Sequence, residues 1–160
     1  RYLVEHGHRK IGYAGQIQGN DNLCDRYFGY RKGLEEQGLS VNPQWLVTGE
    51  RVVYREFDLS LLPSLPTAFI CCSDLVASFV YDELTRLGLR VPEDVSLVGY
   101  DNYLHNHPLA RTITTYNVDM KAMSQTAIRI LLKKIGGDGG YSGVRYLDSY
   151  VKERGSVKTL

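Results

Sequence analysis

The sequence has 160 residues, of which 43% are hydrophobic, with 19 basic and 18 acidic side chains. This length and composition suit one globular domain with a hydrophobic core and exclude a disordered or fibrous chain. The net charge of +1 indicates no broad basic surface for direct DNA binding. No apolar run approaches the roughly 18 residues of a membrane helix, and no export signal leads the sequence.

The three cysteines are odd in number, which argues against a disulfide framework. Cys71 and Cys72 are neighbours in an apolar run, where they are typical of small buried hydrophobic residues, and Cys24 lies alone. Free cysteines of this kind favour a reducing compartment. We therefore expect a cytoplasmic protein with no membrane partner.

The first half of the chain alternates short strands with helices. Residues 1–6 have the pattern of the last turns of a helix, which Gly7 ends, so the sequence begins within an element and we expect it to be a fragment. Apolar spacing predicts four further elements, which are a strand over 11–14, a helix over about 23–37, a strand over 45–48 and a buried strand over 67–72.

The second half is organised around the stretch 89–102. Ser73 and Asp74 cap a helix over 73–87, and Pro92 prevents that helix from resuming after its end. Residues 95–100 then form a buried strand, which Asp101 and Asn102 follow directly. The remaining expected elements are a strand over 113–116, a helix over 119–135, a glycine-rich turn over 136–140, an edge strand within 144–151 and a tail over 153–160.

This alternation predicts an α/β fold with a mainly parallel, doubly wound sheet. The carboxyl ends of parallel strands meet at one edge, so the polar loops there form a ligand crevice. The crevice loops are 20–26, 49–55, 73–74 and 101–106. Together they offer amide, hydroxyl, carboxylate and guanidinium groups suited to a sugar or polyol, although ordinary turn and cap chemistry explains each loop alone.

Motifs of catalysis are scarce in the sequence. It contains no G-x-S-x-G elbow, Walker loop, H-E-x-x-H motif or G-x-G-x-x-G after the first strand. The pairs His6/His8 and His105/His107 fall in loops without cysteine or carboxylate ligands at metal spacing. We therefore expect neither an enzyme, nor a cofactor, nor a metal site.

Five segments carry a family resemblance, and they are Gly7-His8-Arg9-Lys10-Ile11, Asp25-Arg26-Tyr27-Phe28-Gly29-Tyr30, Pro66-Thr67-Ala68-Phe69-Ile70, Ser73-Asp74-Leu75-Val76-Ala77 and Leu89 to Asn102. Together they resemble the effector-binding domain of the lactose/galactose-repressor (LacI/GalR) family of bacterial transcription regulators. The resemblance implies a periplasmic-binding-protein-like fold of two lobes joined by three crossovers, with a small effector in the cleft. It also implies a DNA-binding headpiece upstream, which is absent from this sequence.

The resemblance assigns roles to crevice residues. Arg26 matches the family arginine that grips the effector, and Asp101 matches the acid after the Val-Gly-Tyr strand. Ser73 stands where the family usually has Asn. Arg51 stands near a position often filled by an aromatic residue, which leaves an acidic or phosphorylated effector open beside a sugar. The expected effector-binding set is Asn22, Arg26, Arg51, Ser73, Asp101 and Asn102.

The resemblance also implies a domain plan. Residues 8–110 and about 140–155 would form the second lobe, and residues 112–136 would cross into the first lobe. The segment from Ile113 to Ile135 should therefore not pack on the lobe of residues 8–110. The helix over 73–87 would contribute to a homodimer, with its apolar side chains divided between core and partner, namely Leu75, Val76, Phe79 and Val80.

The sequence thus predicts a cytoplasmic, non-enzymatic effector-sensing domain that is part of a LacI-type regulator and controls operator binding through the absent headpiece. One alternative is a periplasmic sugar-binding protein of an ABC transporter, which shares the fold but should carry an export signal. A doubly wound enzyme is the other alternative, and it would need a catalytic constellation that the sequence lacks.

Overall fold

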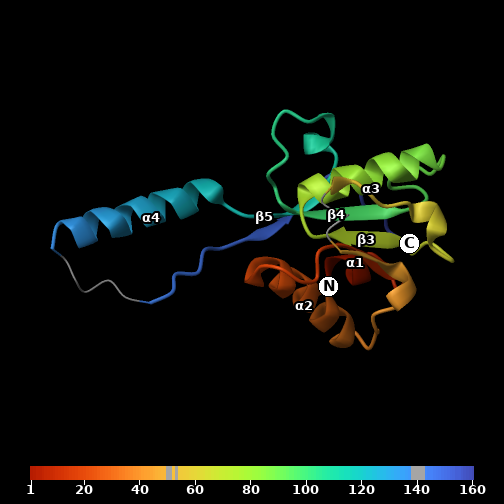
Figure 1. Ribbon diagram of the computed structural model, residues 1–160, viewed down its shortest axis with the longest axis horizontal. Helices are drawn as coiled ribbons and strands as arrows, with labels where there is room; N and C mark the ends of the chain where they lie inside the picture. Colours follow the sequence, from red (N-terminus) through yellow and green to blue (C-terminus); the bar gives the residue numbers. More distant parts are fainter. Residues whose placement is uncertain (50–51, 53, 138–142) are drawn as a thin grey trace.

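The computed structural model describes residues 1–49, 52, 54–137 and 143–160. Within these residues six strands form one sheet in the order β2-β1-β3-β4-β5-β6 (Figure 1). The strands are β1 (Ile11–Gly15), β2 (Leu46–Thr48), β3 (Ala68–Cys71), β4 (Ser96–Asp101), β5 (Thr114–Asn117) and β6 (Tyr150–Lys152). The first five run parallel and β6 runs antiparallel to β5, which confirms the predicted mainly parallel α/β fold.

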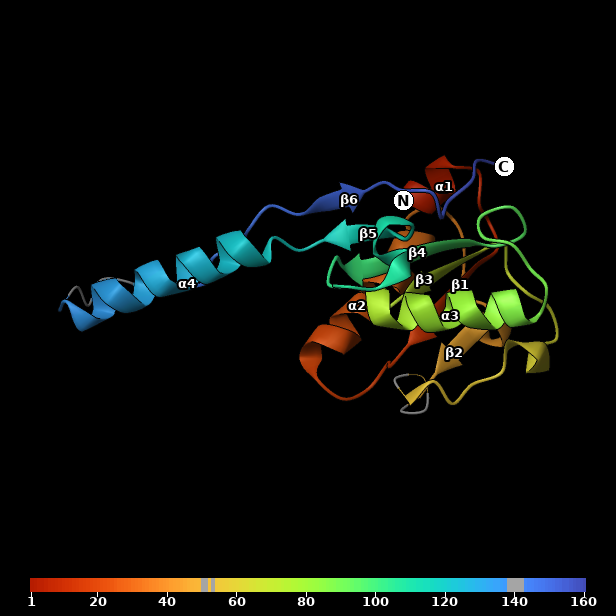
Figure 2. The same cartoon turned by 90° about the horizontal axis from the view of Figure 1, so that it is seen from above.

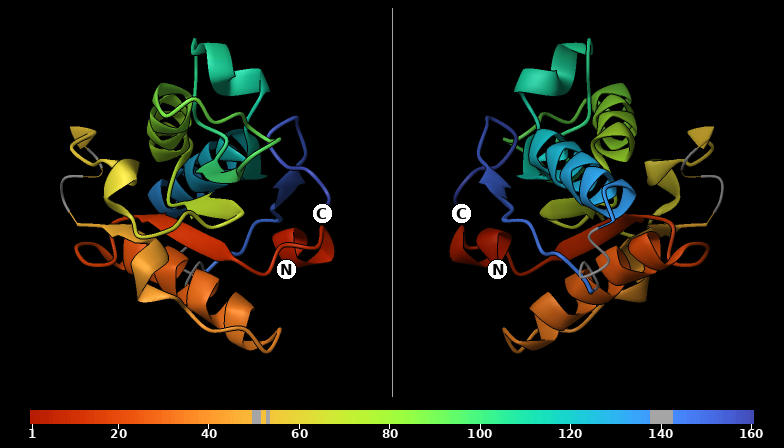
Figure 3. Two further views of the ribbon diagram at one scale, coloured as in Figure 1. Left: turned by 90° about the vertical axis from the view of Figure 1, so that its right-hand side faces the viewer. Right: turned by 90° about the vertical axis from the view of Figure 1, so that its left-hand side faces the viewer.

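Four α-helices accompany this sheet in the described part of the chain, and they are α1 (Tyr2–Glu5), α2 (Asp21–Glu35), α3 (Asp74–Arg86) and α4 (Met120–Ile135). Short 3-10 helices η1 (Pro43–Trp45), η3 (Leu59–Leu61) and η4 (Pro108–Arg111) lie in the connections. Helices α2 and α3 cover opposite faces of the sheet, as the end-on views of Figure 3 show. The molecule is therefore a three-layer structure at β1, β3 and β4.

Side-chain caps fix the starts of the three longer helices. The side chain of Asn20 accepts from Leu23 N at 3.0 Å, and that of Ser73 accepts from Val76 N at 3.2 Å. The carboxylate of Asp119 accepts from Ala122 N at 2.8 Å. Each bond satisfies an amide that a helix leaves without an internal partner.

Helix α3 divides its apolar side chains unequally. Val76 is 1% exposed and Val80 is 0% exposed, so both pack inside their own chain and are not available to a partner. Leu75 is 50% exposed, and Phe79 is partly exposed. Of the predicted interface set, the core takes Val76 and Val80, so only Leu75 and Phe79 stay candidates for contact with a partner.

The C-terminal residues are an ordered part of the sheet layer, so their expected assignment as a tail is wrong. Ser156 is fully buried, and its carbonyl accepts from Leu97 N at 2.8 Å. Leu160 N donates to His6 O at 2.9 Å, which brings the end of the chain to the end of α1. The pairing of β5 with β4 begins only at Val98, so the residues after β6 supply the missing partner for the start of β4.

Helix α4 leaves the body of the molecule (Figures 1 and 2), and none of its residues is buried. Six of its large apolar side chains are between 44% and 81% exposed, and they are Met120, Met123, Ile128, Leu131, Leu132 and Ile135. The expectation that the preceding strand also leaves is wrong, because Thr114 and Thr115 are fully buried in β5. The chain departs after Asn117, and most of the glycine-rich turn lies outside the described residues.

Candidate functional site

The carboxyl edge of the sheet gathers three of the predicted site residues. Asn22 and Arg26 come from the first turns of α2, and Asp101 is the last residue of β4. The Arg26 guanidinium donates through Nη1 to the Cys72 carbonyl at 2.5 Å. Its central carbon lies 4.1 Å from the centroid of the Tyr100 ring. Arg26 therefore bridges the ends of β3 and β4 and is held there by a hydrogen bond and a cation–π contact.

Aromatic side chains extend this cluster across the sheet. Tyr100 and Tyr116 are register partners on β4 and β5, and their rings stack with centroids 5.4 Å apart. Tyr100 ends the strand that the sequence predicts to be buried, but its side chain is only partly buried and faces Arg26. The alternation along a strand predicts on which face of the sheet a side chain lies. Which residue it contacts on that face depends on the helix that packs there.

Asp101 opens the loop after β4 in an unusual conformation. Its φ of 90° and the φ of 53° at Asn102 both lie in the left-handed region, which non-glycine residues rarely adopt. The Asp101 carboxylate accepts from Tyr103 N at 2.9 Å. Burial raises the pKa of Asp101, while this hydrogen bond and the nearby Arg26 charge act in the opposite direction. A partly buried acceptor thus lies close to a fixed cation.

The side chain and backbone of Asn102 form hydrogen bonds within the protein. Its Nδ2 donates to Asn117 Oδ1 at 2.7 Å, and its Oδ1 accepts from Arg154 Nη2 at 2.6 Å. Its backbone N–H donates to Thr115 Oγ1 at 3.3 Å. Both ends of the amide are therefore occupied, so this side chain holds the loop. No sequence signal pointed to Arg154, because its segment reads as a polar tail.

The Ser73-Asp74 pair is built into the start of α3. The Ser73 hydroxyl caps the helix, and Asp74 is 1% exposed. Burial raises the pKa of Asp74 to about 6, and the neighbouring Asp101 charge adds to this rise, while the Thr115 hydroxyl lowers it. A Cβ at Gly99 would stand 2.1 Å from Asp74 Oδ1, so only glycine fits above this carboxyl.

Two cavities lie at this side of the molecule, and Asn22 and Arg26 are the predicted site residues that line one of them. The larger, of about 770 Å³, runs along the α2 face of the sheet past Asn22, Arg26, Tyr100 and Tyr116. The other, of about 470 Å³, lies between residues 16–19 and 48–49 at the ends of β1 and β2. Arg51, the remaining predicted site residue, lies outside the described residues. Both cavities include residues at the carboxyl edge and offer room for a small molecule.

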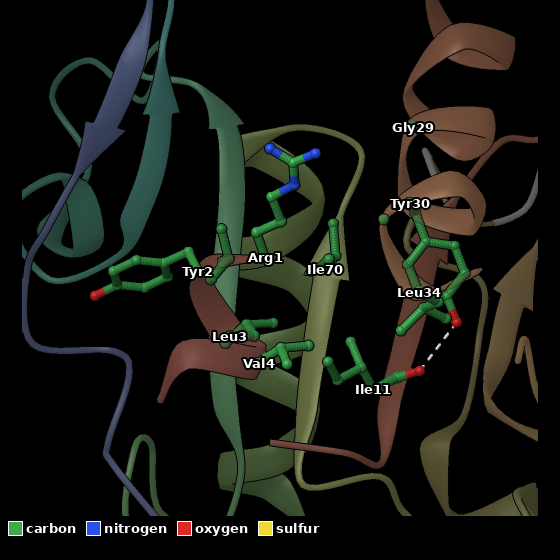
Figure 4. Close-up of a pocket in the computed structure, with 11 residues that line it drawn as sticks. Arg1, Tyr2, Leu3, Val4, Ile11, Gly29, Tyr30, Leu34 and Ile70 are labelled. Atoms are coloured by element: carbon green, nitrogen blue, oxygen red, sulfur yellow. Dashed lines mark hydrogen bonds between the residues drawn. The ribbon is translucent and has the colours of Figure 1, made fainter. Parts of the chain in front are cut away.

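A third, smaller pocket of about 90 Å³ (Figure 4) shares part of its lining with the large cavity, including Tyr30 and Ile70. Its lining includes Leu3, Ile70 and Leu34, and the Tyr30 hydroxyl there donates to Ile11 O at 2.9 Å. The pocket is apolar and lies away from Asp101. It therefore contributes to packing between α1 and α2 and is not a candidate ligand site.

The histidine pair near the start of the chain has structural partners. His8 is fully buried, with Nδ1 2.9 Å from Thr67 Oγ1 and Nε2 3.1 Å from Lys158 O. His6 Nδ1 lies 2.8 Å from Tyr2 O. Within the described ranges, no three His, Cys, Asp or Glu side chains are grouped to hold a metal ion. Nor is any helix of those ranges long and apolar enough to cross a membrane.

A family model and several known proteins match this chain over most of its length. A family model described as a periplasmic binding protein-like domain matches residues 1–157. An HTH-type transcriptional repressor PurR of Haemophilus influenzae is 35% identical over 139 residues, which are 84% of this chain and 41% of that protein. The PurR of Pasteurella multocida is 30% identical over 99% of this chain and 49% of its own length. The chain spans about half the length, or less, of these relatives.

Among solved structures, a transcriptional regulator CelR–cellobiose complex has a TM-score of 0.81 and 29% identity, over 97% of this chain and 49% of that one. A LacI-family regulator from Enterococcus faecium with bound ribose has a TM-score of 0.80 at 23% identity, over 99% of this chain and 60% of that one, which shows the shared fold. These matches agree with the topology found in the sheet.

Proposed function

This chain belongs to the periplasmic binding protein-like domain family, as part of a LacI/GalR effector-binding domain, and we propose that it senses a small effector for a transcription regulator. The cluster of Arg26, Tyr100 and Asp101 carries this proposal, because it joins a held cation, an aromatic ring and a carboxylate at the ligand edge of a parallel sheet. The function is binding, and the relatives are repressors, which agrees with the expected lack of enzymatic activity.

We propose a sugar or sugar derivative as the effector. Carboxylate and guanidinium groups bind hydroxyls in pairs, and an aromatic ring offers a flat apolar face to a sugar ring. Asn22 lies beside Arg26 on the groove and would add an amide. Two structural neighbours hold sugars, namely cellobiose and ribose, which supports this class of ligand. Ser73 and Arg51 remain predicted contacts, and Asn102 would act by holding the loop.

The exposed face of α4 supports the proposal that another lobe covers it in the intact protein. Each large apolar side chain left in water forfeits roughly 1.5–3 kcal/mol of burial, and several line this helix. Residues 8–110 and about 140–155 would form the second lobe, as the sequence predicts. The crossover expected over 112–136 would begin after Asn117, because β5 lies within the sheet.

We further propose a cytoplasmic homodimer that controls operator DNA through a headpiece outside this sequence. Leu75 and Phe79 on α3 would contact the partner, since they are the two side chains of the predicted interface that the core leaves available. Two-fold contacts of this kind are the commonest solution for soluble oligomers. The repressor relatives favour this assignment over a transporter's periplasmic sugar-binding protein.

Calorimetric titration of the chain with cellobiose and with ribose tests the proposed function. Saturable binding of either sugar, lost in an Asp101→Ala variant, is the expected result. Asp94→Ala provides the matched control, because Asp94 lies before the start of β4, at the opposite end of the strand from Asp101, and pairs with Arg90. A sugar response that survives Asp101→Ala would place the effector elsewhere. A panel of phosphorylated sugars tests the acidic alternative in the same way.

A further inference from the structure

The residues that follow β6 reach the loop that carries Asp101. Arg154 lies two residues beyond the end of β6, and its guanidinium bonds in two directions. Nη1 donates to Ile113 O at 2.7 Å, and Nη2 donates to Asn102 Oδ1 at 2.6 Å. Its backbone N–H also donates to Thr114 Oγ1 at 2.9 Å, which locks the residue in place. Arg154 thus spans from β5 to the loop after β4.

That loop needs an external support. Asp101 and Asn102 are consecutive non-glycine residues with positive φ, a combination that costs free energy and persists only where the surroundings impose it. The Asn102 amide is the main handle, held by Asn117 on one side and by Arg154 on the other. Removing the charged donor would leave the Asn102 oxygen without the partner that the structure gives it.

We propose that Arg154 is a positioning residue of the effector site, which holds Asp101 in place through Asn102. The inference rests on the proposed function and adds a residue that lies 52 positions from Asn102 in the sequence and touches no part of the proposed ligand cluster. The guanidinium suits this role because two of its nitrogens donate to two different acceptors, Ile113 O and Asn102 Oδ1, at the same time.

The hydrogen bonds of Asn102 with Asn117 and Arg154 have a regulatory consequence because of where they lie. Asn117 is the last residue of β5, from which the chain leaves towards α4, and Arg154 lies just after β6, by which the chain returns. The effector loop is therefore tied to both strands that connect with α4. A shift of the loop upon binding would act on these two connections directly, through hydrogen bonds of 2.6–2.7 Å.

Amide hydrogen exchange of the ligand-free chain tests the positioning role. In Arg154→Met, the amides of Asn102 and Tyr103 should exchange at least tenfold faster, while the amides of β1 and β3 keep their protection. Arg154→Lys should recover part of the difference. The matched control is Arg90→Met, which removes an arginine whose side chain is exposed and whose guanidinium pairs with Asp94.

Binding measurements with cellobiose and ribose provide the second test of the positioning role. Arg154→Met should weaken binding at least tenfold, and the double variant Arg154→Met/Asn102→Ala should bind no more weakly than Asn102→Ala alone. Unchanged exchange at Asn102 and Tyr103, equal loss of protection throughout the sheet, or additive losses in the double variant would each overturn the proposal. If neither sugar binds the wild-type chain, the effector is neither cellobiose nor ribose, whereas the exchange result still decides the role of Arg154.

Discussion

Arg26 and Tyr100, 74 positions apart in the sequence, lie with the guanidinium carbon 4.1 Å from the ring centroid. The contact places the cation over the ring, while the Nη1 donor of the guanidinium is bound to Cys72 O. A planar, stacked guanidinium presents hydrogen bonds in a fixed direction, which a lysine cannot reproduce. The pair therefore sets the geometry of the proposed effector site.

Replacing Arg26 by Ala should lower affinity for the cognate sugar by about 1.5–3 kcal/mol, the usual contribution of a hydrogen bond to a charged group. Arg26→Lys should lose nearly as much, because the stacked fork is lost while the charge remains. Calorimetry measures both. Arg31→Ala is the control on the same helix, where the side chain is exposed and paired with Glu35. Equal affinity of Arg26→Ala and Arg31→Ala would disprove the assignment.

A methyl group added at Gly99 should destabilise the fold by about 1–3 kcal/mol or more, since overpacked interiors carry this penalty. The new Cβ would stand 2.1 Å from the buried Asp74 carboxylate. Gly29→Ala is the opposite case, because nothing lies within 4 Å of its Cβ position, and alanine in a helix interior gains up to about 1 kcal/mol over glycine. Urea unfolding of the two variants should therefore shift the midpoint in opposite directions.

The stability of the fold should depend on pH through Asp74. Its folded-state pKa of about 6 exceeds the ordinary value of 3.8, so the folded state binds the proton more tightly than the unfolded state does. The resulting contribution to stability is fully present below about pH 3.8 and is lost as the pH rises through about 6. Relative to Asp74→Asn, the wild type should gain stability between pH 7 and pH 5. Urea midpoints that run parallel for both proteins across this range would contradict the prediction.

Leu75→Glu should abolish dimer formation through α3 while it leaves the free energy of unfolding within about 0.5 kcal/mol, as expected of a surface substitution. Val144→Glu serves as the control, because this side chain is also exposed but lies away from α3. Sedimentation at several concentrations gives the measurement. A wild-type chain that stays monomeric at high concentration, or a Leu75→Glu variant that still forms dimers, would refute the proposed interface.

The exposed apolar side chains of α4 lead to a separate prediction. Leu131→Lys/Ile135→Lys should reduce binding of a hydrophobic dye and self-association at high concentration, with little change in the unfolding midpoint, because both side chains are exposed in the chain itself. Val80→Lys tests the contrast, since this side chain is fully buried and the lysine should prevent folding. A large loss of stability in the α4 variant would show that the helix packs on its own chain in solution.

Many helices and strands of this protein could be predicted from local features of the sequence. The caps at Asn20, Ser73 and Asp119 and the buried strands around Phe69 and Leu97 depend on residues only a few positions apart, so the order of strands and helices followed from the chain alone. Parallel pairing then brought Arg26 and Asp101 to the same edge of the sheet. The LacI/GalR assignment, which used the same segments, is confirmed by the comparisons.

The tertiary structure determined which residues far apart in the sequence are in contact. The contact of Arg26 with Tyr100, the grip of Arg154 on Asn102 and the insertion of Ser156 beside Leu97 all join residues tens of positions apart. Such contacts depend on strand register and on which helix covers which face, and neither is encoded in a local pattern. For the same reason α3 placed Val80 in the core and Leu75 at the surface, because burial is a property of the neighbours that packing brings to a side chain.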